Sequence, residues 1–130
     1  MQWPSVASAS EPADWMRENK TLGYYDMMSP REIFYSDLEA EAAAAAAADL
    51  GPQSVPSCSQ TLTQAAWRTT VTTHIYGTRD PFVEVYRSFA ERRADKVRTI
   101  DSGHSAFLSR PAELAAMLRE ELHEAASETT

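Results

Sequence analysis

The sequence predicts an α/β fold, on the strength of its composition and of the order of elements in its second half. Hydrophobic residues make up 43% of the 130 residues, with only 4 Gly and 7 Pro, which is typical of a globular chain. After residue 66 the order is strand, helix, strand, loop, helix. A helix that links two strands of one sheet in this way makes the strands parallel.

The first half is expected to be helical, with no strand pattern before residue 66. A helix should begin at Ser29, where a capping serine, a proline and an acid stand in the order of a helix start. A second helix should begin at Ser36 and Asp37 and run through the seven alanines at 42–48. A Gly-Pro pair should end it, and residues 52–66, rich in Ser, Thr and Pro, should form a linker.

The second half supplies the strands. Residues 71–77 (VTTHIYG) are β-branched and aromatic, and residues 97–100 form a second short strand. Residues 80–94 carry apolar side chains at helical spacing, residues 101–109 are expected as a loop, and a last helix covers residues 111–125. Parallel strands normally belong to a larger sheet that is covered on both faces, so further strands are expected to complete this one.

Without those strands, four apolar side chains are expected to stay half exposed. At roughly 25 cal/mol per Å² of apolar area, the loss is comparable with the whole stability of an ordinary domain. We therefore predict marginal stability for the chain alone. The four are Val71, Ile75, Val97 and Ile100.

Charge and cysteine content exclude several classes of protein. The formal net charge is -7, with 12 Lys and Arg against 19 Asp and Glu, which argues against binding to nucleic acid. No apolar stretch approaches the roughly 20 residues of a membrane span, and the first residues lack a signal-peptide pattern. The single cysteine, Cys58, excludes a disulfide framework and a Cys-rich zinc site. We expect a cytoplasmic protein with no membrane partner, no metal and no other cofactor.

Asp80 and His104 are the candidate catalytic residues. Each follows the C-terminal end of a predicted strand, the edge at which open α/β sheets place their ligand and catalytic sites. A carboxylate beside a histidine fixes the imidazole tautomer and stabilises the imidazolium, so that the histidine can act as a general base. Gly103 should allow the histidine loop to turn sharply. Taken alone, Asp80 fits equally well as the N-cap of the helix that follows it.

Several segments of the second half carry a family resemblance. They are Thr78-Arg79-Asp80 at a strand end, a short crossover helix, and the segments DSGHS and LSRP at 101–105 and 108–111. With them, residues 67–122 resemble the C-terminal part of an α/β-hydrolase-fold serine hydrolase, most closely the esterase branch that includes plant methylesterases and hydroxynitrile lyases. Residues 27–66 look, more weakly, like the end of the helical cap that this family inserts over its active site.

The resemblance implies a partial α/β-hydrolase fold. Residues 1–66 would form a helical cap-like region and linker, and residues 67–130 the last two parallel strands with their helices. By the same resemblance, Asp80 matches the acid and His104 the base of a Ser-His-Asp triad that hydrolyses carboxylic esters.

The nucleophile of the family is absent from these 130 residues. It belongs to a Gly-x-Ser-x-Gly elbow between a strand and a helix, and the sequence contains no such motif. Ser102 and Ser105 stand too close to His104 to present a hydroxyl to its far nitrogen, and Cys58 has no basic neighbour to activate it. We therefore expect the chain to be inactive alone.

Several interpretations follow from this pattern. The chain is expected to be a truncated product, a mis-started reading frame or half of a split enzyme, with a small ester-like substrate and a complementing N-terminal half as its partners. The alternative is a non-catalytic binding or interaction module that pairs with a partner or with a second copy, as a homo-oligomer. An autonomous hydrolase with an unrecognised nucleophile is a third possibility.

Aromatic and methionine side chains are concentrated near the N-terminus. In a cap, such side chains line an acyl or aromatic substrate pocket, whereas exposed they form an adhesive surface. His74, within the first predicted strand, is interpreted as a packed or cap-facing residue. The set comprises Trp3, Trp15, Tyr24, Tyr25, Met27 and Met28.

Overall fold

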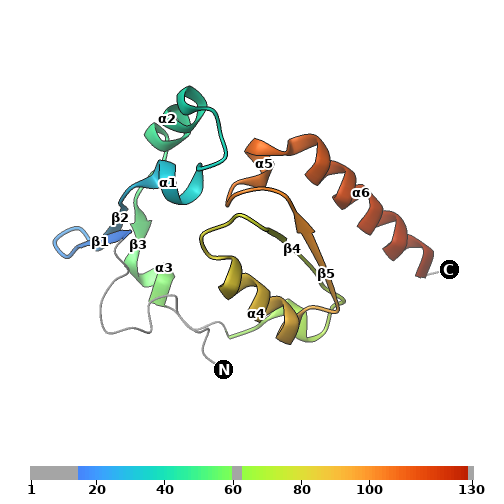
Figure 1. Cartoon of the computed structure of the whole chain (residues 1–130). Coiled ribbons are helices and arrows are strands. Elements are labelled where there is room, and N and C mark those ends of the chain that lie inside the picture. Colours follow the sequence, from blue (N-terminus) through green and yellow to red (C-terminus); the bar gives the residue numbers. More distant parts are fainter. Residues whose placement is uncertain (1–14, 60–62, 129–130) are drawn as a thin grey trace.

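The computed structural model describes residues 15–59 and 63–128, and its elements fall into two groups (Figure 1). The first group is a small antiparallel sheet with three short helices. The second is a pair of parallel strands with a long helix on either face, preceded by a single 3-10 turn, η1 (Ala66–Arg68). The prediction of an α/β fold is confirmed, because helices combine with parallel strands in a partial sheet.

The first half contains strands that the sequence did not predict. β1 (Met16–Asn19) and β2 (Tyr24–Met27) form an antiparallel hairpin, and β3 (Gln53–Ser54) pairs with the other edge of β2. Gly23, with φ of 71°, makes the hairpin turn and donates its N–H to the Asn19 carbonyl at 2.8 Å. The expectation of a strand-free first half and of a plain linker over 52–66 is therefore wrong.

The first helices differ in detail from their predicted starts. α1 (Pro30–Phe34) begins where expected, but Ser29 has φ of 50° and its side chain makes no capping hydrogen bond. α2 (Ala40–Ala48) begins after residues 36–39, which run outside the helix, and a further helix, α3 (Val55–Ser59), follows β3. The hydroxyl and carboxylate of residues 36 and 37 are turned toward the loop around Gly103 instead of capping a helix.

The second half follows the predicted crossover. β4 (Thr73–Gly77) pairs in parallel with β5 (Lys96–Ile100), with Thr73 opposite Lys96 and Gly77 opposite Ile100. α4 (Val83–Arg93) links the two strands, α5 (Ala106–Ser109) occupies the predicted loop, and α6 (Pro111–Glu128) ends the described chain.

Alternation along β4 places α4 and α6 on opposite faces of the strand pair (Figure 1). The His74 ring packs against Tyr86 and Phe89 of α4. The neighbouring Thr73 points the other way, and its hydroxyl donates to Glu121 of α6 at 2.7 Å. The two strands and two helices therefore form three layers. Because this sheet has two strands, the outer edge of β4 and the outer edge of β5 each lack a further strand among the described residues.

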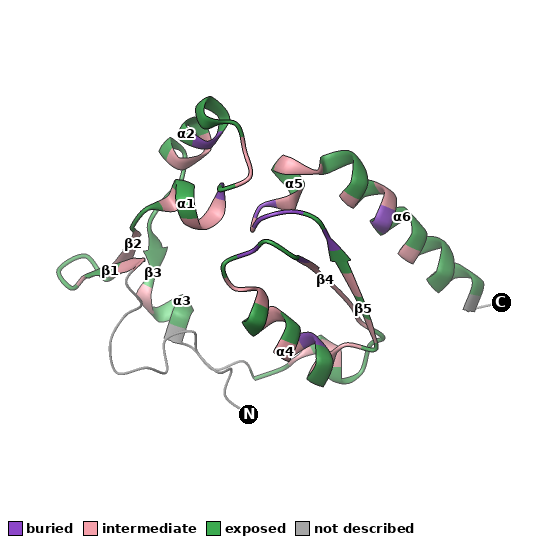
Figure 2. Cartoon of the chain, viewed as in Figure 1, coloured by how far each residue is buried: buried purple, intermediate pink, exposed green. Residues whose placement is uncertain are grey.

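Burial is concentrated where β4 and β5 end (Figure 2). Gly77, Asp80, Ser102, Gly103 and Ser105 are all buried there. The helices add single buried positions such as Ala43, Ala90 and Met117. The best packed part of the described chain is thus the pair of loops that carries the two candidate catalytic residues.

The expectation of half-exposed strand side chains is correct only in part. Ile100 is buried, contrary to the expectation, whereas Ile75 is half-buried as expected. Val71, just before β4, is 77% exposed, and Val97 is also exposed. On α6, Leu118 and Leu122 are exposed as well, so a strip of apolar surface remains beside β4. None of the described helices has the length and hydropathy that crossing a membrane would require.

Candidate active site

The structure brings Asp80 and His104 together. Asp80 lies three residues beyond the end of β4, and His104 lies four residues beyond the end of β5. Nδ1 of the imidazole is 2.9 Å from Oδ2 of the carboxylate. The Asp80 side chain is only 4% exposed, whereas that of His104 is 28% exposed. The carboxylate is thus shielded from water while one edge of the imidazole stays accessible.

Asp80 uses its two oxygens for two tasks. Oδ1 accepts the backbone N–H of Phe82 at 2.8 Å and so stabilises the turn that leads into α4. Oδ2 faces the histidine. An ionised carboxylate only accepts hydrogen bonds, so Nδ1 must donate, and the lone pair of the neutral imidazole then lies on Nε2. The expectation that Asp80 caps the helix is therefore wrong, because Phe82 is the N-cap of α4, and the Asp80 side chain bonds the turn before the helix instead.

The two strand-end loops approach each other through glycine. A Cβ on Gly77 would lie 2.5 Å from the Gly103 carbonyl oxygen and 2.6 Å from that of Ser102. The backbone N–H of Arg79 donates to the Ser102 carbonyl at 3.0 Å. A Cβ on Gly103 would in turn meet Asp37 Oδ1 at 2.8 Å. Gly103 does not adopt a positive φ, so it serves close packing and not the sharp turn that the sequence suggested.

The serines next to His104 are both buried. Ser102 is fully buried and its Oγ donates to the Gly103 carbonyl at 3.0 Å. Ser105 is also buried and precedes α5. Cys58 is exposed and lines the pocket beside His104. None of these three side chains is placed to donate its hydroxyl or thiol hydrogen to the His104 ring.

Aromatic rings surround the exposed side of His104. The centroid of its ring lies 5.0 Å from that of Phe34, 5.7 Å from Phe82 and 6.2 Å from Tyr86. The Trp15 ring meets Phe34 edge-on at 6.0 Å and Phe82 at a tilt at 5.2 Å. Burial, and then the negative charge of Asp80, raise the pKa of Tyr86, so its hydroxyl remains protonated at neutral pH.

These rings form one wall of a pocket of about 370 Å³ that opens onto His104. Its lining is almost entirely apolar, and the first-half strands supply the opposite wall. The aromatic and methionine residues predicted as a pocket lining divide accordingly: Trp15 and Met27 line it, Tyr24, Tyr25 and Met28 do not, and Trp3 lies outside the described residues. The full lining is Trp15, Met16, Met27, Phe34, Gln53, Cys58, Phe82, Val85, Tyr86 and His104.

Asp37 is a neighbour of the site that the sequence did not reveal. The sequence around Asp37 favours a helix start, but its Oδ2 accepts the backbone N–H of Gly103 at 2.7 Å. The two residues are 66 positions apart, so no local pattern signals the contact. The one available signal in the sequence is Gly103 itself, because glycine is favoured where another group approaches the backbone closely.

The other histidines stand apart from this pair. His74 packs among aromatic rings, as expected for a strand residue, and burial lowers its pKa. His123 is exposed on α6. Among the described residues no three His, Cys, Asp or Glu side chains are grouped as metal ligands would be.

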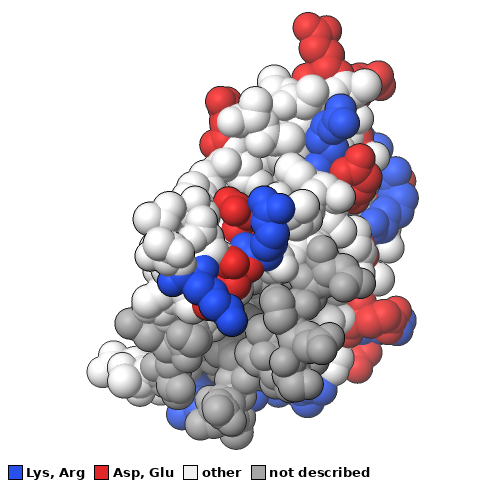
Figure 3. Space-filling view, turned by 90° about the vertical axis from the view of Figure 1, so that its left-hand side faces the viewer, with Lys and Arg blue, Asp and Glu red and all other residues white. Residues whose placement is uncertain are grey.

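Acidic and basic side chains are interspersed on the face shown in Figure 3. Among the described residues on this face, Lys and Arg lie next to Asp and Glu and form no continuous basic patch. Ion pairs such as Arg17 with Asp26 and Arg79 with Asp101 join opposite charges in the described part of the chain.

Parallel strands whose C-terminal ends carry a carboxylate and a histidine in contact are a feature of hydrolases with an open α/β sheet. A family model described as the alpha/beta hydrolase family matches residues 1–117, and the chain belongs to that family. The match includes residues 1–26, which the resemblance of the motifs alone did not place. Comparison with curated proteins gave no match, and comparison with solved structures gave none either.

Proposed function

We propose that this chain contributes the acid and the base of a carboxylic-ester hydrolase of the esterase branch. The observation that carries the proposal is the hydrogen-bonded pair of Asp80 and His104, with the carboxylate buried and the imidazole facing an apolar pocket. Residues 1–66 would act as the cap over this pocket, and residues 67–130 as the end of the catalytic sheet.

In the proposed reaction, Nε2 of His104 removes the proton of a serine as that serine attacks the ester carbonyl. His104 then returns the proton to the leaving alcohol, and in the second half of the cycle activates water against the acyl-enzyme. Asp80 holds the imidazole by Nδ1 and stabilises the positive charge that develops on the ring. The serine and the oxyanion donors would come from a complementing polypeptide segment that carries the elbow.

The pocket supports an uncharged substrate. Its walls are mostly rings and methionine side chains, and its described lining contains no Asp, Glu, Lys or Arg; the titratable groups that line it are those of His104, Tyr86 and Cys58. Burying a free carboxylate or ammonium against such walls would cost several kcal/mol without a partner of opposite charge. An ester with a compact apolar or aromatic group fits these walls and a volume of about 370 Å³.

Complementation tests the proposal. The chain is co-purified with the N-terminal part of a complete α/β hydrolase that carries its own elbow, and hydrolysis of p-nitrophenyl acetate is measured. We expect activity above that of either part alone, and a loss of about 10³- to 10⁴-fold in Asp80→Asn or His104→Ala. His123→Ala, at an exposed histidine, is the matched control and should leave the rate unchanged.

Two results would contradict the proposal: a stable complex without activity, or activity that survives His104→Ala. A fluorophosphonate probe adds an independent check, because the chain alone should show no serine labelling that depends on His104. The coding DNA immediately upstream is also expected to contain a Gly-x-Ser-x-Gly elbow in one of its frames.

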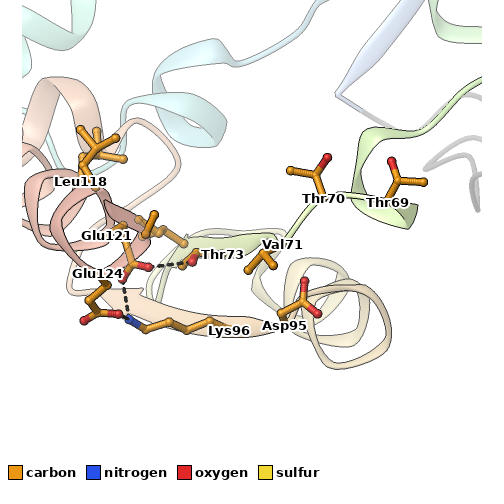
Figure 4. Close-up of a pocket in the computed structure, with 12 residues that line it drawn as sticks. Thr69, Thr70, Val71, Thr73, Asp95, Lys96, Leu118, Glu121 and Glu124 are labelled. Carbon is orange, nitrogen blue, oxygen red and sulfur yellow. Dashed lines mark hydrogen bonds and ion pairs between the residues drawn. The ribbon is translucent and has the colours of Figure 1, made fainter. Parts of the chain in front are cut away.

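A non-catalytic interaction module is the second candidate function. Its support is a wide groove of about 1110 Å³ between α6 and the N-terminal ends of β4 and β5, shown in Figure 4, where Val71 and Leu118 are among the lining residues. An open strand edge with apolar side chains beside it favours pairing with another chain. A chain that forms a stable complex through this groove, yet never gains hydrolase activity, would favour this function over the first.

A further inference from the structure

The carboxylate of Asp37 is buried beside the histidine loop, although the proposed chemistry does not use it. Asp37 lies between α1 and α2, and its side chain is 5% exposed. Oδ2 accepts the Gly103 N–H at 2.7 Å and lies 4.0 Å from Nη2 of Arg79. Oδ1 makes no hydrogen bond in the described part of the chain.

A buried carboxylate is costly to ionise unless its surroundings compensate. Burial by itself would raise the pKa of Asp37. The Gly103 N–H, the nearby Ser109 hydroxyl and the charge of Arg79 act in the other direction and bring the pKa below its ordinary value. Asp37 is therefore a fixed negative charge at neutral pH, and the groups that keep it ionised belong to the loops of the site.

These partners directly precede the two candidate catalytic residues in the sequence. Arg79 stands immediately before Asp80, and Gly103 immediately before His104. Arg79 also joins the two loops, since its Nε contacts Asp101 Oδ1 at 2.8 Å and its Nη2 donates to the Asp101 carbonyl at 3.0 Å. Asp37 thus contacts both loops, in each case at the residue that precedes Asp80 or His104.

The packing around Gly103 reinforces this arrangement. A Cβ there would lie 2.8 Å from Asp37 Oδ1 and 3.1 Å from Ser36 Oγ, so the histidine loop rests directly on the segment before α2. A shift of that segment would move the Gly103 backbone, and the imidazole of His104 with it.

We propose that Asp37 is a positioning residue for His104, which holds the Gly103 N–H and Arg79 so that Nδ1 of the imidazole meets the Asp80 carboxylate. The inference rests on the proposed function of the Asp80–His104 pair. It also assigns a role to the first-half segment between α1 and α2, which would couple the cap-like region to the geometry of the base.

The imidazole tautomer tests this role without any need for turnover. The full chain is labelled with ¹⁵N-histidine and studied by NMR at mildly alkaline pH, where ordinary histidines are neutral. In the wild type we expect the His104 ring to carry its proton on Nδ1. The signal is assigned to His104 by its loss in His104→Gln. In Asp80→Asn we expect the preference for this tautomer to be lost. In Asp37→Ala we expect a shift toward the Nε2–H tautomer, and at least about tenfold less exchange protection of the Gly103 amide.

Two variants separate positioning from a general effect of charge. Asp101→Asn removes the other carboxylate on Arg79 and leaves the Gly103 N–H bonded to Asp37, so the wild-type tautomer should persist. Asp37→Asn keeps an oxygen that can accept this N–H but loses the charge, so its shift should be smaller than that of Asp37→Ala and in the same direction. The signals of His74 and His123 report whether the fold is intact.

The outcomes are distinguishable. A wild-type tautomer in Asp37→Ala despite lost Gly103 protection, or an equal shift in Asp101→Asn, overturns the inference. If Asp37→Ala also changes the NMR signals of His74 and His123, the Asp37→Asn variant decides the test. A His104 tautomer population in Asp37→Asn equal to that of the wild type then overturns the inference. A wild-type His104 whose tautomer does not respond to Asp80→Asn would instead contradict the proposed function of the pair.

Discussion

At the scale of single residues, two glycines allow the candidate site to form. Gly77 ends β4 against the Ser102 and Gly103 carbonyls, and Gly103 rests on Asp37. Backbone atoms surround Gly77, and unlike the end of a flexible side chain they cannot move aside alone. The separation of the two strand ends, and with it the distance between Asp80 and His104, depends on the absence of a side chain at these positions.

Gly77→Ala should therefore destabilise the chain by about 2 kcal/mol or more, because the added methyl group overpacks a site bounded by backbone. Gly51→Ala is the matched control, since no atom lies within 4 Å of the corresponding Cβ, and it should change the stability by less than about 0.5 kcal/mol. Urea unfolding followed by circular dichroism measures both. Equal stability of the two variants would contradict the close approach of the loops.

Residues of the site differ in how far the sequence reveals them. Asp80 and His104 can be predicted as neighbours, because each follows a strand and parallel strands end at the same edge of a sheet. Asp37 cannot, since its partner lies 66 residues away and its local pattern favours a helix start.

At the scale of elements, predictions succeed where a pattern is local and strong. The β-branched run before Gly77 and the helical spacing in α4 and α6 predict those elements to within a few residues. β1 and β2, with the sequences MREN and YYDM, are only four residues long each, and pairing with each other and with β3 holds them in place. Such strands depend on tertiary context, which local propensity does not contain.

The attachment of α6 depends on Glu121. Its carboxylate accepts the Thr73 hydroxyl at 2.7 Å and pairs with Lys96 at 2.9 Å and Arg98 at 3.0 Å. The Thr73 hydrogen bond first, and then these cations, lower the pKa of Glu121 from about 4.5 to about 2. A carboxyl whose pKa is lowered by folding stabilises the fold above its unfolded pKa and loses that contribution as the pH falls toward the folded value.

We therefore expect Glu121→Gln to lower the melting temperature at pH values above about 4.5, and the difference from the wild type to shrink as the pH falls toward about 2. Thermal melts of both proteins across this range measure it. Glu120→Gln is the control. The Glu120 carboxylate is exposed and, of the three partners of Glu121, contacts only Arg98, so its loss should have the smaller effect. A difference that stays constant over the whole pH range would contradict the role of Glu121.

At the scale of the whole molecule, the two sides of the parallel strand pair are unequal. The ends of β4 and β5 are buried and tightly packed, whereas the open edge of β4 adjoins exposed Val71, Leu118 and Leu122. Family membership and the missing elbow motif both agree with an occupant that adds further strands along this edge. In the absence of such an occupant, copies of the chain are available to cover the same apolar surface.

Replacement of Leu118 and Leu122 together by Ser should reduce concentration-dependent association of the purified chain, since both side chains line the groove and Leu122 is 71% exposed. Leu22→Ser is the control, because Leu22 is 66% exposed, a fraction close to that of Leu122, and lies in the turn between β1 and β2, which does not line this groove. Sedimentation velocity over a range of concentrations measures the association. The open edge would lose its assigned role if the wild type sedimented as a monomer throughout, or if Leu22→Ser reduced association as much as the double variant. The double variant should also bind the complementing elbow-bearing segment less tightly. The serines would remove apolar area that this segment is expected to cover.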